Sequence, residues 1–155
     1  MRSSLQRKAK LDIASLLALV MMSGCGGQAT TSPEAALQVL LDAARNADAG
    51  GFRAGFPSRE EIGELFTCPS GVDLIARFDG LSDDFTAWRN ARPTVAAFQA
   101  YQAVPVVPGE DIGGCSARRA MNLMRADIQL DEGGTKKAYS MRFVEIDGRY
   151  RVLGY

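Results

Sequence analysis

The carboxyl third of the chain alternates apolar and polar residues, a pattern typical of β-strands. Three strands are predicted, over 121–130, 137–146 and 149–153. The residues between the first two strands, Asp131-Glu132-Gly133-Gly134, favour a turn. Asp147-Gly148 separates the last two strands, and Asp-Gly favours a type I′ hairpin because both central residues need a positive φ. The pattern therefore predicts an antiparallel sheet at this end of the chain.

The amino-terminal half has helical periodicity. A helix is predicted over 33–48, because a Ser-Pro pair suits its start and Leu and Ala recur at i, i+3, i+4 and i+7. Gly50-Gly51 is expected to end this helix, and Phe52 and Phe56 are expected in the loop that follows. A capping-box pattern then predicts a second short helix over 58–67.

The middle of the chain has weaker patterns. Residues 73–78 are predicted as a third helical turn or a short strand. Helical segments are predicted from Asp84 or Phe85 to Tyr101, with Pro93 resetting the axis. Prolines restrict 104–108 to an edge strand or a connector, and 110–116 is predicted as a loop held by Cys115.

The first residues have the layout of a secretory signal peptide. Four basic residues precede an apolar run from Ile13 to Met22 that only Ser15 interrupts. A transmembrane helix needs about 20 apolar residues, roughly twice the length of this run. Removal of residues 1–24 would leave 131 residues, enough for a single domain. The remaining net charge of −3 makes nucleic acid an improbable partner.

Met22-Ser23-Gly24-Cys25, at the end of this segment, resembles the lipobox of bacterial lipoproteins. The resemblance implies cleavage before Cys25, a diacylglycerol on its thiol and a membrane anchor. Met22 stands where Leu is usual, and the alternative is an ordinary secretory signal cut near Gly24 that leaves a free thiol. Gly26 implies the periplasmic side of the outer membrane if the host is diderm. The expected organisation is a signal peptide (1–24), a flexible tether (25–31) and one domain (32–155).

The three cysteines give an odd count. If Cys25 is lipidated, Cys68 and Cys115 are expected to form a disulfide in an oxidising envelope. The alternative is two buried free thiols. A metal site is not expected, because the chain has no His and no close pair of cysteines, and no cofactor is expected.

Residues 32–155 resemble the nuclear-transport-factor-2-like superfamily in layout. The resemblance rests on the first helix, which closes with 43–48 (Ala-Ala-Arg-Asn-Ala-Asp), and on the terminal hairpin at 147–152 (Asp-Gly-Arg-Tyr-Arg-Val). It implies an α+β fold in which amino-terminal helices pack on a curved antiparallel sheet formed mainly by the carboxyl half. That superfamily often forms a cone with a pocket, and its members often form homodimers through the open sheet face.

The absence of His excludes every His-dependent mechanism. A carboxylate base with a tyrosine donor, such as Asp127 with Tyr139, would suit an isomerase or dehydratase; the simpler interpretation places both on the sheet surface. Trp88, Phe98 and Tyr101 are candidate pocket-lining residues, or plain core. A basic group at 118, 119, 125, 136 and 137 is a candidate anion site, or a solvated sheet face.

The sequence therefore predicts an envelope lipoprotein anchored to the membrane through Cys25. Its domain is expected to be a non-enzymatic module that binds a small apolar ligand or a protein partner. An enzyme of the cone fold is the alternative.

Overall fold

The computed structural model describes residues 30–72 and 81–154. The predicted signal peptide, most of the predicted tether, and the turn or strand predicted at 73–78 lie outside the described residues. The described helices are α1 (Pro33–Arg45), α2 (Ala49–Ala54), α3 (Arg59–Leu65) and α5 (Leu81–Ala91). The described strands are β1 (Phe66–Thr67), β2 (Thr94–Ala100), β3 (Val104–Val106), β4 (Asp111–Ile112), β5 (Cys115–Ala117), β6 (Met121–Glu132), β7 (Thr135–Ile146) and β8 (Arg149–Gly154).

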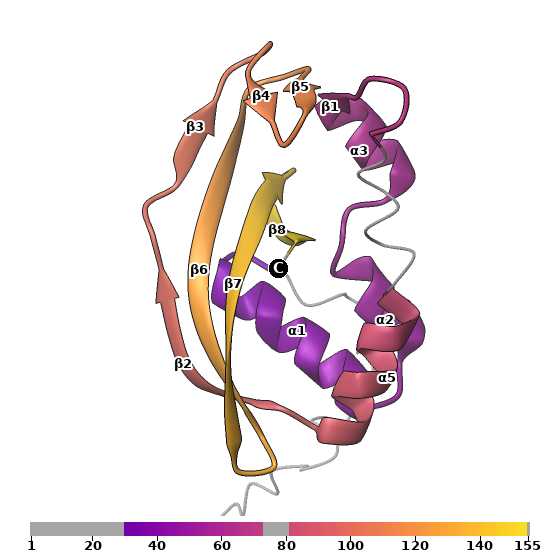
Figure 1. The fold of residues 1–155 in the computed structure, drawn as a ribbon, viewed down its shortest axis with the longest axis vertical. Helices are drawn as coiled ribbons and strands as arrows, with labels where there is room; N and C mark the ends of the chain where they lie inside the picture. The colour runs from indigo at the N-terminus through magenta and orange to yellow at the C-terminus, as the bar shows by residue number, and fades with distance from the viewer. Residues whose placement is uncertain (1–29, 73–80, 155) are drawn as a thin grey trace, which may run out of the picture.

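The main sheet is antiparallel and follows the order β2-β6-β7-β8, with β3 paired to β6 on the same side as β2. Its long strands β6 and β7 bend around the helices, and α1 lies across the sheet on the side that faces α2 and α5 (Figure 1). Asp147 and Gly148 have φ values of 50° and 73°, as the predicted hairpin requires. The α+β prediction is thus confirmed, with a sheet built mainly from the carboxyl half.

Helix α1 forms as its amino-terminal pattern predicts. The Ser32 hydroxyl accepts a hydrogen bond from the Ala35 amide at 3.1 Å, which satisfies one of the free donors of the first turn. Its leucines are buried, and the helix contacts β8 and β2. Just before the helix, Thr30 is buried, and its carbonyl accepts a hydrogen bond from the Tyr150 amide of β8 at 2.8 Å.

The loop predicted to hold Phe52 and Phe56 is wrong for Phe52, which lies with Gly50 and Gly51 in helix α2, whereas Phe56 does lie in the connection after that helix. Helix α1 ends at Arg45, and the Asp48 carboxylate caps the next helix by accepting from the Gly51 amide at 2.9 Å. Phe52 is almost fully buried, and its ring centroid lies within 6 Å of those of Phe56, Phe85 and Trp88, at 5.6, 5.4 and 5.7 Å. Burial of this aromatic side chain offsets the low helix propensity of the two glycines.

The helix predicted beyond Pro93 is also wrong, because 94–100 is strand β2. Helix α5 ends at Ala91, and Arg92 has a φ of 49°, outside the helical region. Proline then lacks the amide that a continuing helix would need. Pairing with β6 places Phe98 opposite Ile128, so its ring packs on the core instead of on a helix.

The predicted loop at 110–116 contains two short strands, and β1, β5 and β4 form a small second sheet beside α3. Helix α3 itself confirms the capping-box prediction: Ser58 and Glu61 bond each other's amides at 3.1 and 2.6 Å. The predicted disulfide is present, and Cys68 and Cys115 close a loop with a sequence separation of 47. Cys115 of β5 is fully buried, so the crosslink joins the end of β1 to a strand that packs in the core.

None of the helices within 30–72 and 81–154 combines the length and the apolarity needed to cross a membrane.

Candidate functional site

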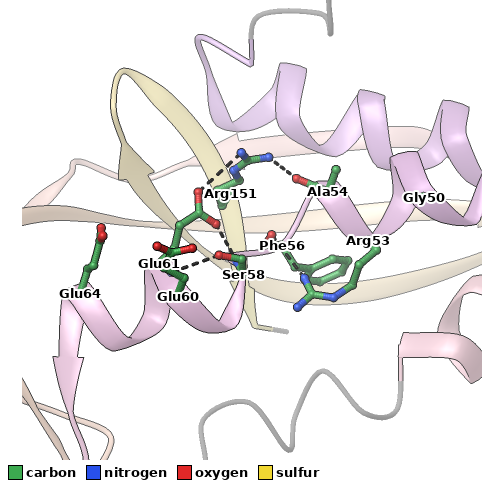
Figure 2. Close-up of a pocket in the computed structure, with 9 residues that line it drawn as sticks. All are labelled: Gly50, Arg53, Ala54, Phe56, Ser58, Glu60, Glu61, Glu64 and Arg151. Carbon is green, nitrogen blue, oxygen red and sulfur yellow. Dashed lines mark hydrogen bonds and ion pairs between the residues drawn. The ribbon is translucent and has the colours of Figure 1, made fainter.

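An open groove of about 660 Å³ lies between α2, α3 and β8 (Figure 2). Nine residues line it: Gly50, Arg53, Ala54, Phe56, Ser58, Glu60, Glu61, Glu64 and Arg151. Five of them carry a charge, two positive and three negative. The groove therefore presents charged groups to an occupant.

Arg151 joins the last strand to both helices. Its guanidinium donates to the Ala54 carbonyl at the end of α2, and it forms an ion pair with Glu61 of α3 at 3.7 Å. The same Glu61 also accepts from the Ser58 amide, so one carboxylate serves the helix cap and the arginine. These contacts fix the wall of the groove where the three elements meet.

Arg53 holds the segment that connects α2 to α3. Its guanidinium donates to the carbonyls of Phe56 and Pro57 at 3.4 and 3.1 Å. The Phe56 side chain is buried beneath this segment. Both cations of the groove are therefore already bound to the protein itself.

Two carboxylates of the groove are left for an occupant. Glu60 and Glu64 lie one helical turn apart on α3, both are exposed, and neither has a hydrogen-bond or ion-pair partner among the described residues. The lining has two arginines and three glutamates, so its net charge is negative by one, and Arg151 is already paired with Glu61. An ammonium or guanidinium group is the chemical class that such a surface attracts.

The three aromatic residues predicted to line a pocket do not share one. Trp88 is buried in the core, 6.4 Å from the ring of Tyr139. Phe98 packs toward Phe143 on the inner face of the sheet, also at 6.4 Å. Tyr101 lies on the opposite face and is 42% exposed, so it belongs to the surface.

Asp127 and Tyr139, the pair considered for catalysis, point to opposite faces of the sheet, because Asp127 is paired with Ser140 and Ile128 with Tyr139. The Tyr101 hydroxyl donates to Asp127 at 2.6 Å, and Arg125 lies 3.2 Å away. The hydrogen bond from Tyr101 lowers the pKa of Asp127, and accepting that bond leaves the carboxylate a weaker base. This surface cluster is exposed and does not resemble a buried catalytic acid or base.

Tyr139 has a different carboxylate partner. Its hydroxyl donates to Glu132 at 2.8 Å, and Lys137 pairs with the same carboxylate at 2.5 Å. Burial, followed by the bond to Glu132, raises the pKa of Tyr139 to about 12. Burial alone would raise the pKa of Glu132, but the bonds from Lys137 and Tyr139 outweigh it and the pKa is lowered. The pair is therefore an ionised carboxylate with a neutral phenol.

The basic residues predicted as an anion site do not gather around one point. Arg118 donates to the Gly63 carbonyl at 2.6 Å, Arg125 is bound to Asp127, and Lys137 is bound to Glu132. Across residues 30–72 and 81–154, no three acidic or cysteine side chains are arranged to hold a metal ion.

The groove itself was not predicted. The capping-box pattern predicts a helix that contains the three glutamates, but Arg151 is 90 positions from Glu61 in the chain. No local signal could connect them. No protein-family model, no curated protein and no solved structure matches this chain.

Proposed function

We propose that this chain is a lipid-anchored protein of the cell envelope, and that its domain is a non-enzymatic binding module. The lipobox-like segment ending at Cys25 supports the anchor. The disulfide between Cys68 and Cys115 supports an oxidising compartment, where such bonds persist. The layout that resembles the nuclear-transport-factor-2-like superfamily is consistent with a binding role.

We further propose that the module binds a cationic segment of a protein partner in the groove between α2, α3 and β8. One observation carries this proposal: Glu60 and Glu64 are exposed and have no partner within 30–72 and 81–154, whereas Arg53 and Arg151 are bound by the protein. A lysine or arginine side chain would meet two carboxylates on one helix face.

The anchor is tested by expressing the full-length chain and its Cys25→Ser variant in a diderm host that processes lipoproteins. We expect mass spectrometry to find acyl groups on Cys25 and the wild-type chain in the membrane fraction. The variant is expected to lose both acylation and membrane retention. An unmodified Cys25 on a secreted chain would refute the anchor but would leave the groove untouched.

The groove is tested with a lysine octapeptide as the probe and a glutamate octapeptide as its control. The double variant Glu60→Gln/Glu64→Gln removes both free carboxylates. Since an exposed ion pair contributes up to ~1 kcal/mol, loss of both should weaken the Kd for the lysine peptide by up to about 30-fold.

The matched control is Glu34→Gln/Asp83→Asn, which removes the same charge from exposed sites on α1 and α5. It should leave the Kd nearly unchanged. Equal weakening by both double variants would show that peptide binding depends only on the net charge of the domain, and it would refute the groove as the binding site.

A further inference from the structure

The two edges of the main sheet differ. The β8 edge is covered, because the amides of Tyr150 and Val152 donate to the carbonyls of Thr30 and Gly55 at 2.8 and 2.9 Å. The opposite edge is formed by β2 and β3 (Figure 1), and no described segment pairs with their outer side. Within the part of the chain that the structure describes, this second edge is therefore unpaired.

The open edge lacks the usual protection by charge. No Asp, Glu, Lys or Arg occurs from Pro93 to Gly109. Three of the large apolar or aromatic residues exposed on the molecule lie in this stretch: Tyr101, Val104 and Val107, at 42%, 59% and 60% exposure. Natural edge strands are commonly guarded by charged side chains, so an uncharged edge of this length is a surface that can pair with another strand.

The direction of the backbone groups defines the part that can pair. The Tyr101 amide donates to the Arg125 carbonyl of β6 at 2.9 Å, so the backbone N–H of Tyr101 points toward β6. Backbone groups of successive residues in an antiparallel strand point to alternate sides. The N–H and C=O of Gln99 therefore also point toward β6, whereas those of Phe98 and Ala100 point toward the open edge. An irregularity lies between Val95 and Ala97, which confines regular pairing to 97–101.

We propose that this edge pairs with the same edge of a second copy of the chain, antiparallel, about a two-fold axis at Gln99. Phe98 then exchanges both backbone hydrogen bonds with Ala100 of the second copy, and Gln99 faces its own equivalent. Tyr101 lies opposite Ala97 of the second copy on the outer face, which gives its exposed ring an apolar neighbour.

Charge is the reason for choosing a second copy as the occupant. Antiparallel self-pairing places each residue of 97–101 opposite another from the same set, and none of these residues is charged. No like charges therefore meet, and no charge loses water without a partner. Five residues a side bury less surface than a standard interface, so the pairing is weak and depends on concentration.

The test is oxidative crosslinking of the purified full-length chain. Gln99 turns its backbone away from the new partner, so the two copies of residue 99 would be a non-hydrogen-bonded pair with Cα atoms about 4.5 Å apart. That distance suits a disulfide. A Gln99→Cys variant should form a covalent dimer at a yield at least 5-fold above that of the wild-type chain. The wild-type chain serves as the control for any dimer that forms through Cys25.

Ser140→Cys is the matched control. Asp127 pairs with both Gln99 and Ser140, so residue 140 lies at the same level of the same face but two strands further from the axis. The two copies of residue 140 would be about 24 Å apart, too far for a disulfide. Equal crosslinking at 99 and 140 would indicate random collision and overturn the proposal.

A second variant separates pairing from folding. Ala100→Pro removes an outward amide but no bond to β6, so the monomer should keep its thermal midpoint within a few degrees. In the Gln99→Cys background it should abolish the covalent dimer. Persistence of the dimer, or a covalent adduct of residue 99 with another protein in place of a second copy, would refute self-pairing.

Discussion

Reduction of the disulfide between Cys68 and Cys115 should cost the domain a large part of its stability. The bond closes a loop with a sequence separation of 47. The loss of chain entropy in the unfolded state then corresponds to about 4 kcal/mol at 25 °C in the chain-entropy model. Net stabilities of domains are ~5–15 kcal/mol, so the reduced protein should remain folded with a narrow margin.

The assay is urea denaturation of the oxidised protein and of the same protein in reducing agent. Both samples keep the two sulfur atoms in the core, so the difference reports the crosslink and not lost packing. The reduced form should also have a larger m-value, because its unfolded chain exposes more surface. A difference in the free energy of unfolding below about 1 kcal/mol would refute the entropic reasoning.

Two further predictions concern α2 and the alkaline limit of stability. A Cβ at position 51 would overlap an oxygen of Asp48, whereas one at position 50 would make an ordinary 3.5 Å contact. Gly51→Ala should therefore displace the helix cap and be less stable than Gly50→Ala by about 1 kcal/mol in urea denaturation; equal midpoints would contradict this. Tyr139 has a pKa raised from 10.0 to about 12, so the folded state holds the proton more strongly than the unfolded state. The contribution of Tyr139 to the free energy of unfolding is complete below pH 10 and should be lost as the pH rises toward 12. In Tyr139→Phe, the free energy of unfolding should therefore depend less on pH between 10 and 12.

Local signals were enough for much of the fold. The strands β6, β7 and β8 follow from alternation and from Asp147-Gly148, whose positive φ values are a property of the turn alone. Helices α1 and α3 follow from their serine caps, which act over three residues. The disulfide followed from counting cysteines, without knowledge of where either one lies.

The errors arose where distant contacts decide the local structure. Residues 94–100 have apolar spacing compatible with a helix, but β6 offers an unpaired strand edge to them. Phe52 was placed in a loop because of the glycines before it, yet its burial among aromatic rings stabilises a helix there. The groove depends on Arg151 reaching Glu61, which only the folded topology brings about.

The hydrogen bond between the Thr30 carbonyl and Tyr150 has a mechanical consequence in the proposed anchored form. Thr30 is five positions after Cys25, so the distance between them is at most about 18 Å. The domain would therefore lie close to the lipid headgroups, and its rotation would be restricted. A force applied to the lipid would act first on the hydrogen bond between Thr30 and β8. Rupture of this bond would lengthen the connection to the membrane before the core unfolds.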